Sequence, residues 1–240
     1  SFPWYIRMVD VQTKIAKDLG FPSVPRLKSE VARRIAAFVE NGGFLFAMCA
    51  AIDSFDIALA AHGFDIVPEL LDGSPPTPDV QSKLDFNRTM AFKNFTLTFD
   101  PNEYEFSDID ISRYENPPEK EAFVLFPFSA KYDPVPAMLT QNHESLIAGF
   151  FGQTTSFKRS TLKPGVILMG TVVASDRAKY IYGGRGKGLF SFLGGHDPED
   201  FSHIVGEAAT DVSLYKHSPG YRLILNNILF PAAKKQKRET

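Results

Sequence analysis

The sequence predicts a layered α/β domain, and three observations support this. First, two glycines are followed by the apolar run Phe44-Leu45-Phe46-Ala47-Met48, which is typical of a strand covered on both faces. Second, helical and extended patterns alternate over the first 67 residues. Third, the chain closes with a helical pattern from Pro219 to Leu229, with proline in its first turn.

The first half of the chain predicts three helices and two strands. Helical periodicity predicts helices over residues 4–19, 29–41 and 54–62, which end at Gly20, Gly42 and Gly63. The strands are expected at 44–48 and 64–67. A strand ending at Cys49 should lie inside the sheet, with its neighbours supplied by residues before Ser1 or by the second half of the chain.

The middle of the chain, about residues 70–160, predicts a β-rich insertion. Turn-forming residues fill 70–88, strands are expected at 96–99, 104–111 and 123–128, and residues 129–157 form polar loops. Loops of this kind often carry function. Beyond them, residues 166–173 predict a strand, and 178–182 with 188–193 predict a hairpin around Gly183-Gly184-Arg185-Gly186-Lys187.

Composition limits the classes of partner. The charged fraction is 22% and the formal net charge is −2, so nucleic acid and acidic membrane surfaces are not expected to bind. No stretch approaches eighteen consecutive apolar residues, so no membrane span is expected. A small-molecule substrate or ligand is the expected partner. A start at Ser1 indicates a processed or truncated chain, so a preceding segment or a second copy could complete the structure.

Cys49 is the candidate nucleophile. It ends the apolar strand, small residues flank it, and a helical pattern follows, which is the pattern of a sharp strand-to-helix turn. In such a turn, backbone N–H groups near Ala50 would hold an oxyanion. The alternative interpretation is that Cys49 is a small buried hydrophobic residue.

His196 is the candidate base. It follows Gly194-Gly195 at a strand end, and Asp197 or Glu199 could orient it. The alternative is a turn histidine that caps local backbone. Two polar loops could line a pocket beside Cys49 or could simply be solvated; their candidate residues are Gln141, Asn142, His143, Gln153 and Thr154. No cofactor is expected, and no metal, because His143, His196, His203 and Asp197 lack compact ligand spacing.

Three segments carry a family resemblance: Glu40-Asn41-Gly42-Gly43-Phe44, the stretch from Tyr182 to His196, and the closing helix from Gly220 to Asn227. With these, the chain resembles the class I glutamine amidotransferase-like superfamily and, within it, the trehalose-utilisation (ThuA-like) branch. The whole chain also resembles bacterial proteins labelled asparagine synthetase B. The resemblance implies a three-layer flavodoxin-like fold, one domain over residues 1–240 that lacks N-terminal strands, and export from the cytoplasm.

Two motifs depart from the amidotransferase pattern. Ala47 and Ala51 replace the glycines on either side of the nucleophile, and Glu199 lies three residues after His196 rather than two. The chain also lacks the N-terminal cysteine and the Ser-Gly-Gly-x-Asp-Ser run of true asparagine synthetase B, so ATP-dependent asparagine synthesis is not expected.

Three functional hypotheses follow. The first is an amidotransferase-like hydrolase that uses Cys49, His196 and a carboxylate on an amide or acyl substrate. The second is a non-catalytic ligand-binding or cell-envelope protein that keeps the fold. The third, a carbohydrate-related protein, depends on the ThuA-like resemblance alone.

Overall fold

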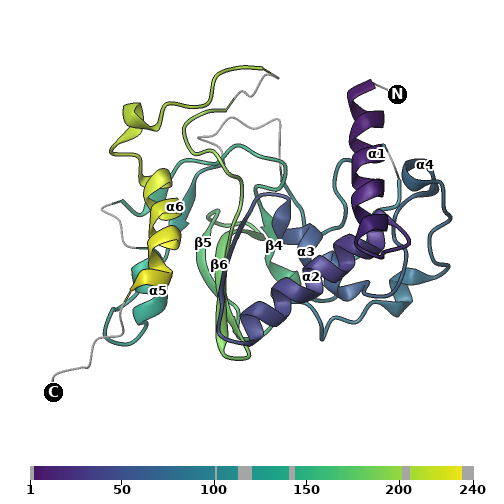
Figure 1. Ribbon diagram of the computed structural model, residues 1–240. Helices are drawn as coiled ribbons and strands as arrows, with labels where there is room; N and C mark the ends of the chain where they lie inside the picture. Colours follow the sequence, from purple (N-terminus) through teal and green to yellow (C-terminus); the bar gives the residue numbers. More distant parts are fainter. Residues whose placement is uncertain (1–2, 101, 113–120, 141–143, 202–205, 234–240) are drawn as a thin grey trace.

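The computed structural model describes residues 3–100, 102–112, 121–140, 144–201 and 206–233 (Figure 1). The α-helices are α1 (Pro3–Asp18), α2 (Val24–Glu40), α3 (Ala51–Ala60), α4 (Glu69–Asp72), α5 (Pro134–Leu139) and α6 (Pro219–Leu229). The short 3₁₀ helices are η1 (Val80–Lys83), η3 (Arg159–Thr161), η4 (Val212–Tyr215) and η5 (Phe230–Ala232). The predicted first and last helices are therefore confirmed. The second helix begins earlier than expected, because the Ser23 side chain caps it by accepting the N–H of Arg26.

The strands form one mixed sheet. They are β1 (Phe44–Met48), β2 (Phe123–Leu125), β3 (Leu146–Ile147), β4 (Phe157–Lys158), β5 (Ile167–Thr171), β6 (Arg177–Arg185) and β7 (Gly188–Leu193). The order is β1-β7-β6-β5-β2-β3, with β4 also paired to β6. Among the described pairs, only β1 and β7 run parallel. The prediction of a mostly parallel sheet is wrong, because the short turns that join β5 to β6 and β6 to β7 reverse the chain.

Strand β1 lies at one edge of the described sheet, not inside it as predicted. Its partner β7 comes from the second half of the chain, with Phe44 opposite Leu189 and Met48 opposite Leu193. The two strands run in the same direction, so their carboxyl ends meet. Cys49 and His196 follow those two ends, and the sheet therefore delivers both candidate residues to one place.

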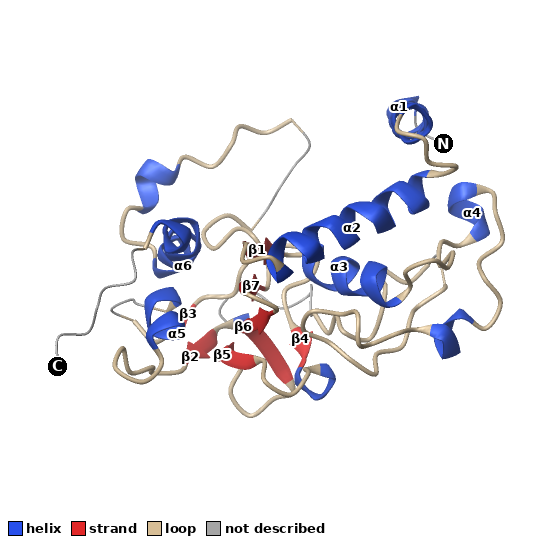
Figure 2. Cartoon of the chain, turned by 60° about the horizontal axis from the view of Figure 1, so that its bottom comes forward, coloured by secondary structure: helices blue, strands red, loops and turns tan. Residues whose placement is uncertain are grey.

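Helices cover both faces of the sheet (Figure 2). On one face, apolar residues of α2 and α3 pack with Ile181 of β6 and with Phe190 and Phe192 of β7. On the other face, Leu139 of α5 and Leu223 of α6 pack with β2, β5 and Tyr180. Burial of these aromatic and aliphatic side chains fixes the sheet between two helical layers.

The middle region is less regular than predicted. β2, β3 and β4 join the main sheet, but residues 96–99 and 104–111 form only isolated bridges such as Leu97 to Ser107. Side chains replace a regular ladder here: the carboxylate of Asp108, for example, accepts the Thr96 N–H at 2.6 Å. Residues 64–67 are not a strand either, because the Asp65 carboxylate accepts the Val67 N–H at 3.0 Å and bends the backbone.

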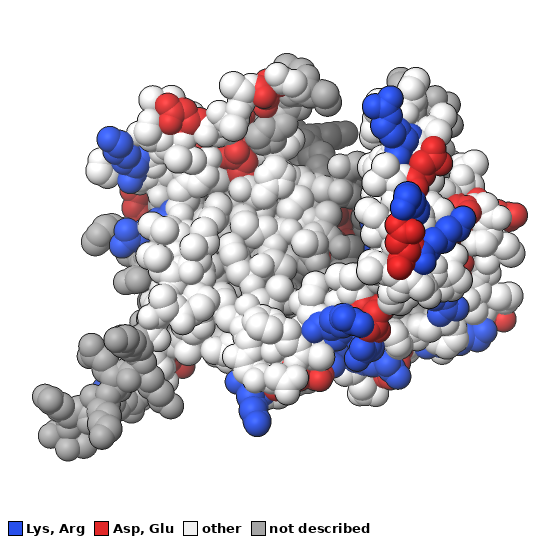
Figure 3. Space-filling view, in the orientation of Figure 1, with Lys and Arg blue, Asp and Glu red and all other residues white. Residues whose placement is uncertain are grey.

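Helix α1 projects from the body and buries only Ala16 among its described residues (Figure 1). It exposes several large apolar side chains, including Trp4 at 65% and Val11 at 53%. Charged side chains gather over α1 and α2, whereas the centre of the same face is largely uncharged (Figure 3). Among the described residues, none of the helices has the length and apolar character needed to cross a bilayer.

Candidate active site

Cys49 lies in a strained turn between β1 and α3. Its φ is 56°, a left-handed conformation that costs an L-residue about 1–2 kcal/mol. Its N–H still donates to the Leu193 carbonyl at 3.3 Å, which ties the turn to the end of β7. Strain of this kind persists only where the surroundings impose it, and it concentrates at functional sites. Alanine at positions 47 and 51 therefore does not prevent a strained turn, because the strain lies at Cys49 itself.

His196 reaches the same place from the end of β7. The chain turns at Gly195, whose φ is +74°, and it leaves His196 exposed with its ring edge-on to Phe151 at 5.9 Å. A Cβ added to Gly152 would lie 2.9 Å from Cys49 Sγ and 3.1 Å from His196 Cδ2. Cys49 Sγ and His196 Cδ2 are therefore at most about 6 Å apart, which places the thiol and the imidazole in one site.

The segment from Phe151 to Thr154 clamps this pair. The Phe151 N–H donates to the Asp197 carbonyl at 2.7 Å, and the His196 N–H donates back to the Phe151 carbonyl at 2.8 Å. The N–H of Gln153 donates to Cys49 Sγ at 3.1 Å. This contact fixes the Cys49 side chain against the backbone of the Phe151–Thr154 segment.

The two candidate carboxylates differ in their surroundings. Asp197 accepts hydrogen bonds from the N–H groups of Glu199 and Asp200 and from the hydroxyls of Tyr221 and Thr210. Burial acts to raise the pKa of Asp197, but these bonds outweigh it and hold that pKa below its usual value. Asp197 thus anchors the turn after His196. Glu199 is half-buried and lines a cavity of about 350 Å³ with Glu144, Pro198 and the start of α6.

Ala50 forms the N-cap of α3. The first N–H groups of a helix have no acceptor within the helix, so the Ala50–Ala51 backbone offers donors beside the thiol. The Ala50 carbonyl accepts the Ser54 hydroxyl, which steadies the turn from the side of the helix.

The predicted pocket residues divide into three groups. Gln141, Asn142 and His143 lie outside the described residues, as does His203. Gln153 reaches the site through its backbone N–H, as described above. Thr154 is fully buried, so it supports the site and does not line a pocket. Within the described part of the chain, no three His, Cys, Asp or Glu side chains are arranged to hold a metal ion.

Sequence reasoning missed two titratable groups that interact with Asp110. Burial raises the pKa of Tyr104, and so does the nearby charge of Asp110. Asp53, in the first turn of α3, is completely buried. Burial and the nearby charge of Asp110 raise the pKa of Asp53 to about 7. The one available signal for Asp53 was a carboxylate four residues after the cysteine, at the start of a helix rich in apolar residues.

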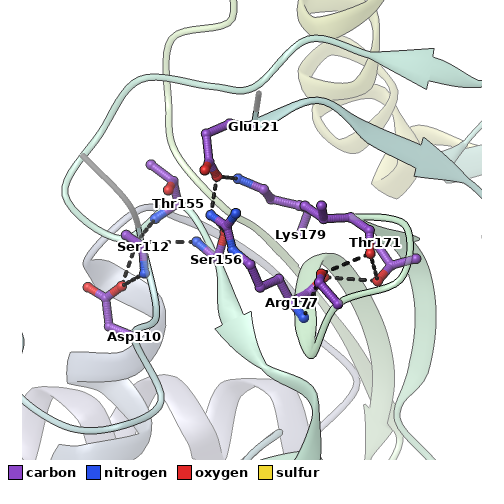
Figure 4. A network of polar contacts seen from close by, with 10 residues as sticks. Asp110, Ser112, Glu121, Thr155, Ser156, Thr171, Arg177 and Lys179 are labelled. Atoms are coloured by element: carbon purple, nitrogen blue, oxygen red, sulfur yellow. Dashed lines mark hydrogen bonds and ion pairs between the residues drawn. The ribbon is translucent and has the colours of Figure 1, made fainter. Parts of the chain in front are cut away.

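A buried ionic cluster supports the clamping segment from behind (Figure 4). Glu121 pairs with Arg177 and with Lys179, the latter at 2.8 Å. Burial lowers the pKa of Lys179 to about 8, and the carboxylate of Glu121 opposes that shift. Arg177 also donates to Ser156 Oγ at 2.9 Å, and Ser112 Oγ accepts the Thr155 N–H at 2.6 Å. These contacts fix residues 155–156, so the preceding residues cannot move far from Cys49.

Comparison of the chain with protein-family models, with curated proteins and with solved structures finds no match. The function is therefore argued from the geometry of the site.

Proposed function

We propose that this protein is a cysteine-dependent hydrolase or amidotransferase-like enzyme that acts on an amide or related acyl group. One observation carries the proposal: the Cys49 thiol and the His196 ring both lie beside Gly152, 2.9 Å and 3.1 Å from the position of an added Cβ, at the ends of the two parallel strands. A nucleophile and a base that are brought together from separate strands form the core of a Cys–His site.

The proposed reaction follows from the positions of these groups. His196 takes the thiol proton as Cys49 Sγ attacks the carbonyl carbon, and the C–S bond forms while the C=O π electrons move to oxygen. N–H groups at Ala50 and the start of α3 stabilise the oxyanion. When the tetrahedral intermediate collapses, His196 gives the proton to the departing amine. Water, deprotonated by His196, then hydrolyses the thioester to release the acid and restore the thiol.

Supporting groups have distinct roles in this proposal. The Gln153 N–H holds Cys49 Sγ in position for the attack. Glu199 is the better candidate to orient His196, because the Asp197 carboxylate already accepts hydrogen bonds from the backbone of the turn and from the Tyr221 hydroxyl. No nucleotide takes part in this chemistry.

The fold supports a finer assignment. We propose that the chain belongs to the class I glutamine amidotransferase-like superfamily, with a three-layer flavodoxin-like arrangement. Helical layers on both faces, and a parallel strand pair that carries cysteine and histidine at its ends, support this proposal. The antiparallel strands β2 to β6 are then additions to the parallel core.

The test is the rate of Cys49 alkylation by iodoacetamide as a function of pH, in the wild type and in His196→Ala. His217→Ala is the matched control, because His217 is exposed and lies in the turn before α6. The proposal predicts rapid alkylation with an apparent pKa well below about 8.5, lost in His196→Ala and kept in His217→Ala. Glutamine and simple amides would then be assayed as substrates.

The proposal would be contradicted by an alkylation rate that rises only near the free-thiol pKa and is the same in the wild type and in His196→Ala. Cys49 would then be an inert side chain, and the fold would serve ligand binding without catalysis.

A further inference from the structure

Two buried carboxyl groups and one hydroxyl meet directly behind the nucleophile. Thr154 Oγ1 lies 3.0 Å from Asp110 Oδ2 and 3.4 Å from Asp53 Oδ1. Asp53 belongs to the helix that starts after Cys49, and Thr154 follows the residue whose N–H contacts the thiol. The three side chains therefore connect the two elements that hold Cys49.

The hydroxyl cannot donate to both carboxyl groups. Threonine has one hydroxyl hydrogen and accepts through its lone pairs. If both carboxyl groups were ionised, one of the two contacts would bring oxygen lone pairs together without a proton. A proton on one carboxyl group satisfies both contacts: Thr154 donates to one and accepts from the other.

The surroundings decide which carboxyl group holds that proton. Asp110 accepts from both the N–H and the hydroxyl of Ser112, and such bonds favour its ionised form. Asp53 is completely buried, and its Oδ2 has no hydrogen-bond partner among the residues that the structure describes. An ionised carboxylate with an unpaired oxygen costs far more in a buried site than a neutral carboxylic acid with an unpaired carbonyl oxygen.

We propose that Asp53 is held as a neutral carboxylic acid that donates to Thr154, and that this contact positions the Gly152–Thr154 segment against Cys49. Asp53 is then a positioning residue for the nucleophile, and its role rests on the proposed function of Cys49. Loss of its proton would remove the contact and leave two buried negative charges facing each other.

This arrangement makes the site sensitive to alkali. The pKa of Asp53 rises from 3.8 to about 7, chiefly through burial and then through Asp110. Because the folded-state pKa is raised, the stabilisation by Asp53 is complete below its unfolded value and is lost as the pH rises through about 7. Among the described residues, the titratable groups that interact with Asp110 include the Tyr104 hydroxyl and the Lys179 ammonium group.

Hydrogen exchange of residues 150–156, measured by mass spectrometry at about pH 5.5 and about pH 8.5 and corrected for intrinsic rates, tests this inference. In the wild type we expect the protection of these backbone amides against exchange to be roughly tenfold lower at the higher pH. In Asp53→Asn, whose amide donates at any pH, protection should not depend on pH. Thr154→Val should lose protection at both pH values, and Thr154→Ser should restore the wild-type response.

Thr140→Val is the matched control, because it removes another buried hydroxyl whose bond to the Pro136 carbonyl lies away from the site. It should keep the wild-type pH response. If Asp53→Asn fails to fold, the Thr154 pair still decides the question. Protection that is independent of pH in the wild type, or equally dependent in Asp53→Asn, would overturn the inference. Exchange needs no catalysis, so a failure of the alkylation test would overturn the proposed function alone.

Discussion

Replacing Gly152 by alanine tests the close approach of thiol and imidazole directly. The new Cβ would lie 2.9 Å from Cys49 Sγ, 3.0 Å from the Gly195 Cα and 3.1 Å from His196 Cδ2. The φ of Gly152 is +149°, which also disfavours an L-residue. Crowding in a packed site costs about 1–3 kcal/mol, and the backbone strain adds about 1–2 kcal/mol.

Gly63→Ala is the matched control, because Gly63 also has a positive φ, +94°, but no atom within 4 Å of the added Cβ. Gly63→Ala should lower the free energy of unfolding only by the backbone strain, about 1–2 kcal/mol. Thermal unfolding and iodoacetamide labelling of both variants make the comparison. We expect Gly152→Ala to unfold at a temperature roughly 2–12 °C below Gly63→Ala and to label as slowly as His196→Ala. Labelling at the wild-type rate, with stability equal to Gly63→Ala, would refute the proposed packing of the site.

Three further predictions concern stability and are measured by urea denaturation. Cys49→Gly should be more stable than Cys49→Ala by about 1 kcal/mol, because glycine adopts the left-handed φ freely; equal stabilities would show that this turn holds no strain. Asp56→Ala should lower the free energy of unfolding by about 3–5 kcal/mol, because the buried carboxylate accepts three backbone N–H groups. The exposed control Asp18→Ala should change it by no more than about 0.5 kcal/mol, and an equally small change in Asp56→Ala would contradict the prediction. Glu121→Ala should cost about 3–5 kcal/mol below pH 8, because it leaves two buried cations unpaired. That cost should shrink above about pH 8, where Lys179 becomes neutral and no longer needs its partner; a cost that does not change with pH would rule out a charged Lys179.

Local patterns in the sequence determined much of the fold. The strand before Cys49, the helix after it, the β6–β7 hairpin and the final helix all follow from apolar periodicity and from glycine and proline positions. The candidate nucleophile and base were identified for the same reason, because each follows the end of an apolar strand. Local signals also misled: residues 96–111 have strand-like composition, yet nearby aspartates take up the backbone donors.

Only the tertiary structure decided how the sheet is ordered and what surrounds the thiol. Among the described strands, β1 lies at an edge and pairs with β7 alone, and this placement depends on packing between segments far apart in the chain. The contact of Gln153 with Cys49 spans 104 positions, and that of Thr154 with Asp53 spans 101. No local propensity encodes such contacts, because they arise from strand register and from the burial of helices on both faces. The sequence by itself indicated Cys49 and His196 as candidates, and the packing of the segment around Gly152 decided that both lie beside it.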